Sequence, residues 1–283
     1  MGVLYNLLIT RPYSWITIVS IALLGGILAR GTLIPDIYSA IDVLFAMSVW
    51  VTFASFTEYW HAKTDSRVRI TKQMLLGLIA LVFIICLLRN PVTIVLVLLL
   101  VLFNVLYSFK IKPWKLSHFS FVFRGFLETL ILIGIIFFYG RYDVIPYSIP
   151  VVVAIFLFTD ARNLIGDVRD IDIDKFTFPK KYGAKSTCAL SAILILAGIF
   201  VTGNIMISLP MLVPFFALIL KSDKKHSYKT HKISVLATTF FILNYAAYLL
   251  DYSLIITNLF FLASILNFTY DLVPRKSNHY YIQ

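Results

Sequence analysis

Long apolar runs separated by short polar segments recur along the whole chain. A helix that crosses a bilayer needs about 20 predominantly apolar residues, and most of these runs approach that length. The pattern therefore predicts about nine or ten spanning helices, because the eighth run is short and the tenth begins just after Asp251. The predicted spans are Trp15–Leu33, Tyr38–Trp60, Met74–Leu88, Val92–Tyr107, Phe119–Tyr139, Tyr147–Ile165, Thr187–Thr202, Ile207–Leu220, Ile233–Leu250 and Leu254–Leu272.

The composition favours a membrane protein over a soluble domain. Of the 283 residues, 60% are hydrophobic and only 14% are charged, whereas soluble domains carry about 25% charged residues. We therefore predict an all-α, polytopic membrane bundle, formed by residues 1–283 as one domain. Cys86 and Cys188 both lie in or beside apolar runs. They indicate neither a disulfide framework nor a zinc site.

Positive charge is concentrated in alternate loops. The loops after the even-numbered spans are basic, whereas the odd-numbered loops hold only Arg30, Arg89 and Arg141 and little other ionisable content. The basic residues of the even loops are Lys63, Arg67, Arg69, Lys72, Lys110, Lys112, Lys115, Arg169, Lys175, Lys180, Lys181, Lys185, Lys221, Lys224, Lys225, Lys229 and Lys232. By the positive-inside rule, these loops and the N-terminus are predicted to be cytoplasmic. The net charge of +11 is then mainly topological, which argues against nucleic acid and for anionic lipid or a phosphorylated substrate.

The sixth span ends in a strongly acidic stretch. Asp160, Asn163, Asp167, Asp170 and Asp174 follow one another at alternating spacings of three and four residues. On a helix this spacing places all five on one face, where the carboxylates repel each other. Such a stripe needs a positive partner, and a divalent cation with hard oxygen ligands, above all Mg²⁺ with a phosphate-bearing substrate, is the simplest one.

The second span ends in a similar way. Thr57, Glu58, His61 and Asp65 share one helical face at its predicted cytoplasmic end. Ionisable groups at the end of a membrane helix are costly and are usually functional or interfacial. Because both polar helix ends lie on the same predicted side, the pattern suggests two halves that converge on one site.

These two helix ends resemble the aspartate motifs of the UbiA superfamily of intramembrane prenyltransferases. The second motif of that family begins with Arg and an acidic or amide residue and continues with three spaced aspartates. Its matches here are Arg162, Asn163, Asp167, Asp170 and Asp174, followed by Thr177-Phe178-Pro179 and Tyr182-Gly183. Further likenesses are Arg11-Pro12 with Trp15, and Leu106-Tyr107-Ser108 before Lys110, Lys112 and Pro113. The resemblance extends to about residue 250.

The first motif departs from the family pattern. Thr57, Glu58 and His61 stand where the family has Asn, Asp and Asp, and only Asp65 is retained. Glutamate still offers oxygen ligands to Mg²⁺, whereas histidine is a softer ligand.

The resemblance implies a helical bundle around a central cavity that faces the cytoplasm. It implies that Mg²⁺ is held against the diphosphate of an isoprenoid whose tail lies among the helices, and that an acceptor captures the allylic carbocation. Aromatic faces would stabilise that cation. The partners implied are an isoprenoid diphosphate and the lipid bilayer; no obligate protein partner is inferred.

The resemblance also assigns roles to individual residues. The expected metal ligands are Glu58, His61, Asp65, Asn163, Asp167, Asp170 and Asp174. Arg162 and Lys110 are expected to bind the diphosphate. Asp167, Asp174, Tyr107 and Lys112 are expected to act in catalysis, Lys112 as a contact of the phosphate oxygens and Tyr107 as a hydrogen-bond donor.

Two other functions remain open. One is a terpene cyclase of the same superfamily, in which a double bond of the substrate captures the cation. The other is a transporter or lipid-binding scaffold without enzymatic activity. The second is disfavoured because both acidic clusters lie at one side, rather than at the bilayer midplane where secondary transporters bind substrate.

A few polar residues carry structural expectations. Arg124 and Glu128, four residues apart in the fifth span, are predicted to form an intramembrane ion pair. Asn104 and Asn244 are predicted to form hydrogen bonds between helices. His226 and His231 are predicted to lie in a solvated basic loop.

Overall fold

The computed structural model describes residues 12–61, 71–108, 118–172, 177–220 and 224–269, and every regular element within them is a helix. The elements are α2 (Pro12–Arg30), α3 (Ile37–His61), α4 (Lys72–Arg89), α5 (Thr93–Ser108), α6 (Ser120–Phe138), η2 (Tyr142–Val144), α7 (Ile145–Arg169), α8 (Phe178–Tyr182), α9 (Ala184–Thr202), α10 (Ile205–Leu220), α11 (Lys224–Leu249) and α12 (Leu254–Thr269).

Each apolar run of the sequence forms one helix, so the predicted all-α membrane bundle is confirmed. Six of the described helical segments are long and apolar enough to cross a membrane, and four apolar helices are shorter. The short ones include α10, which contains Pro210 and Pro214, and α12. The tenth predicted run is therefore a helix of the bundle.

Hydrogen bonds between amide side chains attach α12 to its neighbours. Asn244 of α11 donates from Nδ2 to Oδ1 of Asn258, at 2.9 Å, and to the carbonyl of Ile207 in α10, at 3.1 Å. Asn258 in turn donates to the carbonyl of Met206, at 3.1 Å. The prediction of interhelical bonding is thus confirmed for Asn244. It was wrong for Asn104, whose amide bonds to the carbonyl of Leu100 one turn earlier in α5.

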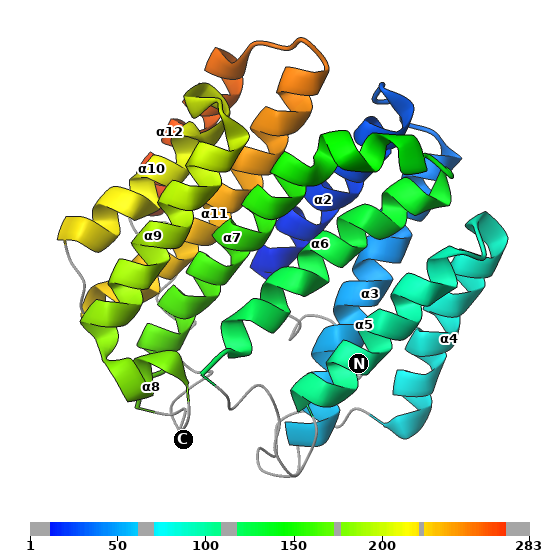
Figure 1. Cartoon of the computed structure of the whole chain (residues 1–283), viewed down its shortest axis with the longest axis horizontal. Helices are drawn as coiled ribbons and strands as arrows, with labels where there is room; N and C mark the ends of the chain where they lie inside the picture. Colours follow the sequence, from blue (N-terminus) through cyan, green and yellow to red (C-terminus); the bar gives the residue numbers. More distant parts are fainter. Residues whose placement is uncertain (1–11, 62–70, 109–117, 173–176, 221–223, 270–283) are drawn as a thin grey trace.

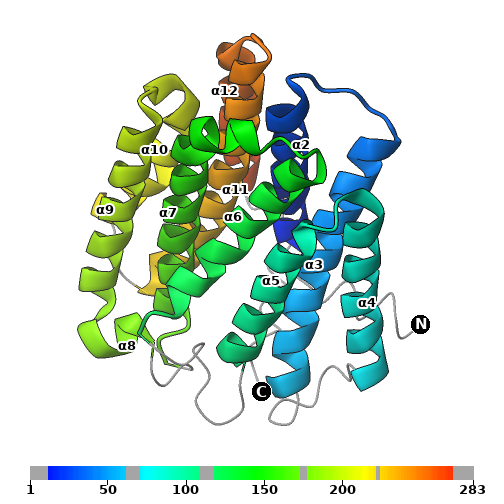
Figure 2. The ribbon, with the colours of Figure 1, turned by 45° about the vertical axis from the view of Figure 1, so that its right-hand side comes forward.

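The helices α2 and α6 connect the N-terminal helices α3–α5 to the C-terminal helices α7–α12 (Figures 1 and 2). The helix α2 packs against α3, α6 and α11, and α6 packs against α2, α5 and α7. The most extensive packing in the described bundle involves α7, which lies between α6, α9 and α11. Its close approach to α9 depends on Gly198, because a Cβ there would overlap the fully buried ring of Phe158. Small residues allow helices to approach closely in membranes, where lipid supplies no hydrophobic drive for association.

The C-terminal ends of α3 and α7 lie at the same end of the bundle, together with α8 (Figures 1 and 2). We call this the acidic end. The opposite end, which we call the far end, carries η2 and the turn between α2 and α3. The two helix ends with the predicted motifs therefore lie where one site can include both.

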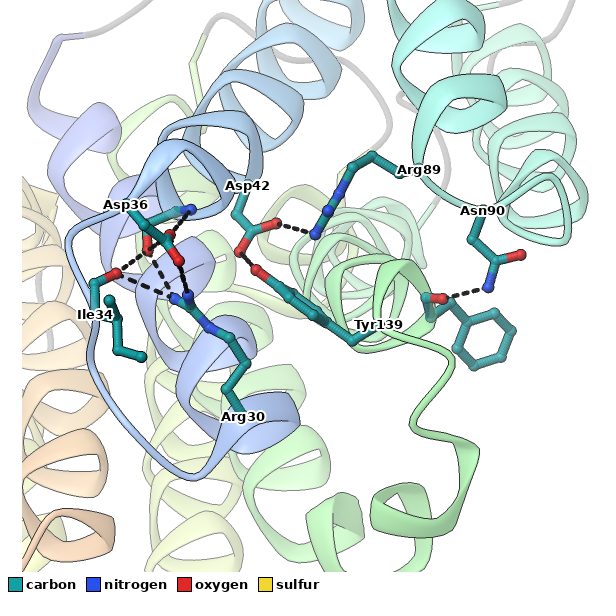
Figure 3. Close-up of polar contacts among 9 residues, drawn as sticks. Arg30, Ile34, Asp36, Asp42, Arg89, Asn90 and Tyr139 are labelled. Atoms are coloured by element: carbon teal, nitrogen blue, oxygen red, sulfur yellow. Dashed lines mark hydrogen bonds and ion pairs between the residues drawn. The ribbon is translucent and has the colours of Figure 1, made fainter.

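The far end holds a polar cluster that the sequence pattern did not predict (Figure 3). Asp42 of α3 is 1% exposed. It accepts a hydrogen bond from the hydroxyl of Tyr139, at 2.6 Å, and lies 3.8 Å from Nη2 of Arg89. Beside it, Arg30 donates to Asp36 at 2.9 Å. We call these five residues the far-end cluster. The three arginines of the odd loops, Arg30, Arg89 and Arg141, each pair with an aspartate at this end.

Aromatic rings cover the arginines of the far-end cluster. The guanidinium carbon of Arg89 lies 4.7 Å from the ring centres of both Tyr38 and Tyr139. The guanidinium carbon of Arg30 lies 5.4 Å from the ring centre of Tyr139. Cation–π attraction of this kind strengthens when the cation is desolvated. The cluster therefore ties together the far ends of α2, α3, α4 and α6.

Candidate functional site

The C-terminal half of α7 is a polar segment enclosed by other helices. The helix begins at Ile145, with Pro146 in its first turn, and ends at Arg169, where the N–H of Asp170 bonds to the carbonyl of Gly166. All residues from Phe158 to Val168 are buried, and four of them carry an ionisable or amide side chain: Asp160, Arg162, Asn163 and Asp167. Buried polar groups must be hydrogen-bonded or paired to be tolerated, and α6 supplies partners for two of the four.

The first contact joins α6 to Asp167. Nη2 of Arg124 donates to Oδ1 of Asp167 at 2.7 Å, and the two form an ion pair. The hydroxyl of Ser120 lies 3.5 Å from Oδ2 of the same carboxylate, at the outer limit of a hydrogen bond. The side chain of Asp167 is 5% exposed and that of Arg124 is 21% exposed. Asp167 is therefore held from α6 on both of its oxygens.

The second contact lies one turn further along α6. Glu128 accepts hydrogen bonds from Arg162, on Oε1, and from the hydroxyl of Thr159, on Oε2, at 2.7 Å. Both charged side chains are almost completely buried. Nη1 of Arg162 is also buried and has no hydrogen-bond partner among the described residues. We call Arg124, Glu128, Arg162 and Asp167 the α6–α7 ladder.

The pairing in the α6–α7 ladder differs from the ion pair predicted within α6. Arg124 and Glu128 were expected to pair with each other along α6, but each pairs across the interface with α7. Gly125 permits this arrangement, because a Cβ there would lie 2.9 Å from the ring of Phe156 and would overlap the carboxylate of Asp160. The helices approach so closely at this point that oppositely charged groups of α7 reach both side chains.

His231 was missed as a neighbour of the site. It was expected in a solvated loop, but it lies on α11 and is only 7% exposed. Its Nδ1 is 2.9 Å from the carbonyl of Arg162. Its ring lies over Gly166, where a Cβ would come within 3.2 Å. A carbonyl only accepts, so Nδ1 carries a proton in this contact. The run of lysines around His231 suggested a loop, whereas it forms the polar first turns of α11.

The short helix α8 covers the acidic end beside α6. It begins at Phe178, after the buried Thr177, and ends at Gly183, whose φ of 84° is in the left-handed region that favours glycine. The ring of Phe178 meets that of Phe121 edge to face, with centres 6.0 Å apart. The residues that follow the second motif therefore fold back onto the start of α6.

Tyr107 lies on α5 and is buried. Its ring centre is 5.4 Å from that of Phe53 in α3. Together they line a small pocket between α3, α5 and α6, whose other walls are Leu100, Phe103, Phe123, Leu127 and Leu130. The pocket is almost entirely apolar and rich in aromatic rings.

The other predicted site residues are only partly described. Asn163 is buried on α7, and its Nδ2 has no hydrogen-bond partner in the described part of the chain. Asp170 pairs with the adjacent Arg169 at 2.5 Å. Glu58 and His61 belong to the last turn of α3, and their side chains lie outside what the structure describes. Lys110, Lys112, Asp65 and Asp174 lie outside the described residues.

The donor chemistry of the acidic end suits Mg²⁺, which takes hard oxygen ligands. Asp167, Asp170 and Asn163 provide such oxygens within about two turns of chain. Among the described residues, however, no group of three or more His, Cys, Asp or Glu side chains is close enough to hold a metal. Both described carboxylates are also engaged by arginines. A complete metal site would therefore need Asp174 and the residues of the first motif as well.

No protein-family model and no curated protein sequence matches the chain. Solved structures do. A digeranylgeranylglyceryl phosphate synthase is 17% identical, with a TM-score of 0.62, over 86% of this chain and 99% of that one. The apo structure of a UbiA homologue from Aeropyrum pernix K1 is 15% identical, with a TM-score of 0.61, over 81% and 96%. A UbiA homologue from Archaeoglobus fulgidus bound to Cd²⁺ is 14% identical, with a TM-score of 0.57, over 84% and 98%. At these identities the likeness is one of fold.

Proposed function

We propose that this chain, which has the fold of the UbiA homologues, is an Mg²⁺-dependent intramembrane prenyltransferase. It would ionise an isoprenoid diphosphate and transfer the prenyl group to an acceptor. The observation that carries the proposal is the burial of Arg162, Asn163 and Asp167 together at the end of α7, against α6. A membrane protein buries charges at such a cost that they usually mark a functional site.

The residues proposed to hold Mg²⁺ are Asn163, Asp167, Asp170 and Asp174 of the second motif, with Glu58, His61 and Asp65 of the first. When bound, Mg²⁺ supplies neutralisation of the charge that develops on the departing diphosphate. Nη1 of Arg162, buried and without a hydrogen-bond partner in the part of the chain that the structure describes, is a donor for a diphosphate oxygen. Lys110 and Lys112 would add to this positive environment.

The aromatic residues around Tyr107 would stabilise a carbocation that lies beside them. The pocket that they line, about 10 Å³ in volume, has room for about one water molecule and not for an isoprenoid. Phe53, Phe103, Phe123 and Tyr107 turn aromatic rings toward a space that is almost free of polar atoms. Aromatic faces attract a cation, and the absence of water protects it from premature capture. Tyr107 would also donate a hydrogen bond toward the leaving group.

The relatives in fold agree with this proposal. One is a synthase of digeranylgeranylglyceryl phosphate, and another binds a divalent metal, Cd²⁺. By the positive-inside rule we also propose that the acidic end faces the cytoplasm, because Arg169 in the last turn of α7 and Lys180 and Lys181 of α8 lie in elements at that end.

The test is release of diphosphate by purified protein, in Mg²⁺, from a panel of isoprenoid diphosphates with and without aromatic or hydroxylated acceptors. Acceptor-dependent release is expected. Release without an acceptor, with a cyclic hydrocarbon or alcohol as product, would identify a terpene cyclase instead. Absence of release under all conditions, with isoprenoid binding equal in wild type and Asp167→Asn, would overturn the enzymatic proposal in favour of a transporter or lipid-binding protein.

A further inference from the structure

We propose that Arg124 of α6 pairs with the carboxylate of Asp167 as long as no cation is bound there. When a cation binds Asp167, the guanidinium of Arg124 is released and binds the diphosphate. This inference rests on the proposed function and adds a residue outside both acidic motifs. Its basis is the 2.7 Å contact between Nη2 of Arg124 and Oδ1 of Asp167.

The guanidinium of Arg124 contacts Asp167 in the way that a bound cation would. The carboxylate of Asp167 is only 5% exposed, so water solvates its charge poorly and a positive group must stabilise it. The nearest positive group that the structure gives it is the guanidinium of Arg124. A cation at Asp167 must therefore displace this guanidinium or share the carboxylate with it, and in both cases like charges oppose each other.

Arg124 is also better placed to move than its counterpart in the ladder. Its side chain is 21% exposed, whereas that of Arg162 is 6% exposed and bonded to Glu128, which Thr159 fixes in turn. A side chain that is partly exposed can exchange partners more readily than one that is enclosed on all sides. Arg162 is therefore the fixed donor of the ladder and Arg124 the exchangeable one.

The exchange gives Arg124 opposite effects on the two ligands. Before the diphosphate arrives, its charge disfavours a metal ion at Asp167. When a diphosphate is present, the same charge favours binding, because guanidinium groups pair strongly with phosphate oxygens. A residue with a merely structural role would change the two affinities in the same direction or not at all.

The experiment measures two affinities of the full-length protein in detergent. The first is for Mn²⁺ alone, by electron paramagnetic resonance, and the second is for inorganic diphosphate in saturating Mg²⁺, by calorimetry. We expect Arg124→Gln to bind Mn²⁺ about tenfold more tightly than wild type and diphosphate about tenfold more weakly, within the usual range of coupling between sites. The double variant Arg124→Gln/Asp167→Asn should lose the gain in Mn²⁺ affinity.

Arg124→Lys and Arg141→Gln complete the design. The lysine keeps the charge with fewer donors, so both affinities should lie between those of wild type and Arg124→Gln. It also carries the test alone if Arg124→Gln fails to fold, since both shifts keep their direction. Arg141 pairs with Asp143 at the far end. Arg141→Gln therefore removes one positive charge far from Asp167 and should change neither affinity.

Each result is decisive. An Mn²⁺ affinity that stays equal or falls on substitution of Arg124 would overturn the inference, as would an unchanged diphosphate affinity, and both would leave the proposed function standing. If neither wild type nor any variant binds Mn²⁺ or diphosphate, the inference falls together with the proposed function.

Discussion

The two ends of α6 touch two buried ionic clusters that differ in their charge balance. Arg124 at one end belongs to the α6–α7 ladder, and Tyr139, about 22 Å further along the helix, belongs to the far-end cluster. In the far-end cluster two arginines face two aspartates. In the ladder region two arginines face three carboxylates among the described residues, because Asp160 is buried there beside Glu128 and Asp167.

The imbalance explains why only one of the clusters is proposed as a site. In the far-end cluster two arginines match two aspartates, and aromatic rings cover the guanidinium groups. Oδ1 of Asp42 and Nε and Nη2 of Arg89 are nevertheless buried without a hydrogen-bond partner among the described residues. The ladder region has one carboxyl group more than it has arginines, and Oδ1 of Asp160 has no hydrogen-bond partner in the described part of the chain. A cation at the acidic end would have a carboxyl group beyond those that the arginines pair with, whereas the far-end cluster has none to spare.

Asp167→Asn should have the largest effect and should separate the clusters most clearly. The amide cannot neutralise a metal ion, so turnover should fall by a factor of about 100 or more, as expected when a main electrostatic group is removed, while expression stays intact. Asp42→Asn is the matched control, because it makes the same change in a buried aspartate of the other cluster. Its turnover per folded molecule should equal that of wild type. Equal turnover in both variants would remove the second motif from the site.

Asp42→Asn should instead lower stability. The carboxylate of Asp42 accepts a hydrogen bond from the hydroxyl of Tyr139 and pairs with Arg89. Loss of such charge-assisted contacts should lower the free energy of unfolding by about 2 kcal/mol. Thermal unfolding in detergent, followed by circular dichroism, measures this. Tyr139→Phe keeps the ring beside both arginines and removes only the hydroxyl, so its effect should be smaller, about 1 kcal/mol. If Tyr139→Phe were the more destabilising, the cluster would depend on that hydroxyl rather than on its charge pair.

The sequence predicted the helices well and their contacts poorly. A membrane helix must be apolar over most of its length, so each run, including the one that forms α12, is visible without any knowledge of its neighbours. The position of the second motif at the end of α7 follows in the same way. The partner of Arg124 does not, because it depends on the register of α6 against α7, which Gly125 permits.

The far-end cluster shows the same limit. Asp42 lies within an apolar run, and only the folded chain brings it to Arg89 and Tyr139, which are distant in sequence. One signal was available: the arginines of the odd loops lie on the same predicted side as Asp36 and Asp42. Opposite charges on one side of a membrane bundle predict pairing, although they do not give the partners.

Asp36→Asn should have the smallest effect, and its dependence on pH identifies the cause. Asp36 precedes α3 and accepts the backbone N–H of Ser39, at 2.8 Å, as well as the guanidinium of Arg30. These contacts, the backbone hydrogen bond first, lower the pKa of its carboxyl group below 3.8. A carboxyl group with a lowered pKa stabilises the folded state above the pKa of the unfolded chain, and this contribution is lost as the pH falls through the folded-state pKa.

Asparagine caps a helix about as well as aspartate, so the variant Asp36→Asn removes the charge and little else. The melting temperature of Asp36→Asn should therefore lie slightly below that of wild type at pH 7, and the gap should close as the pH falls below 3.8. A gap that stays constant over this range would mean that Asp36 contributes through its shape rather than its charge, and the far-end cluster would then contain one ion pair instead of two.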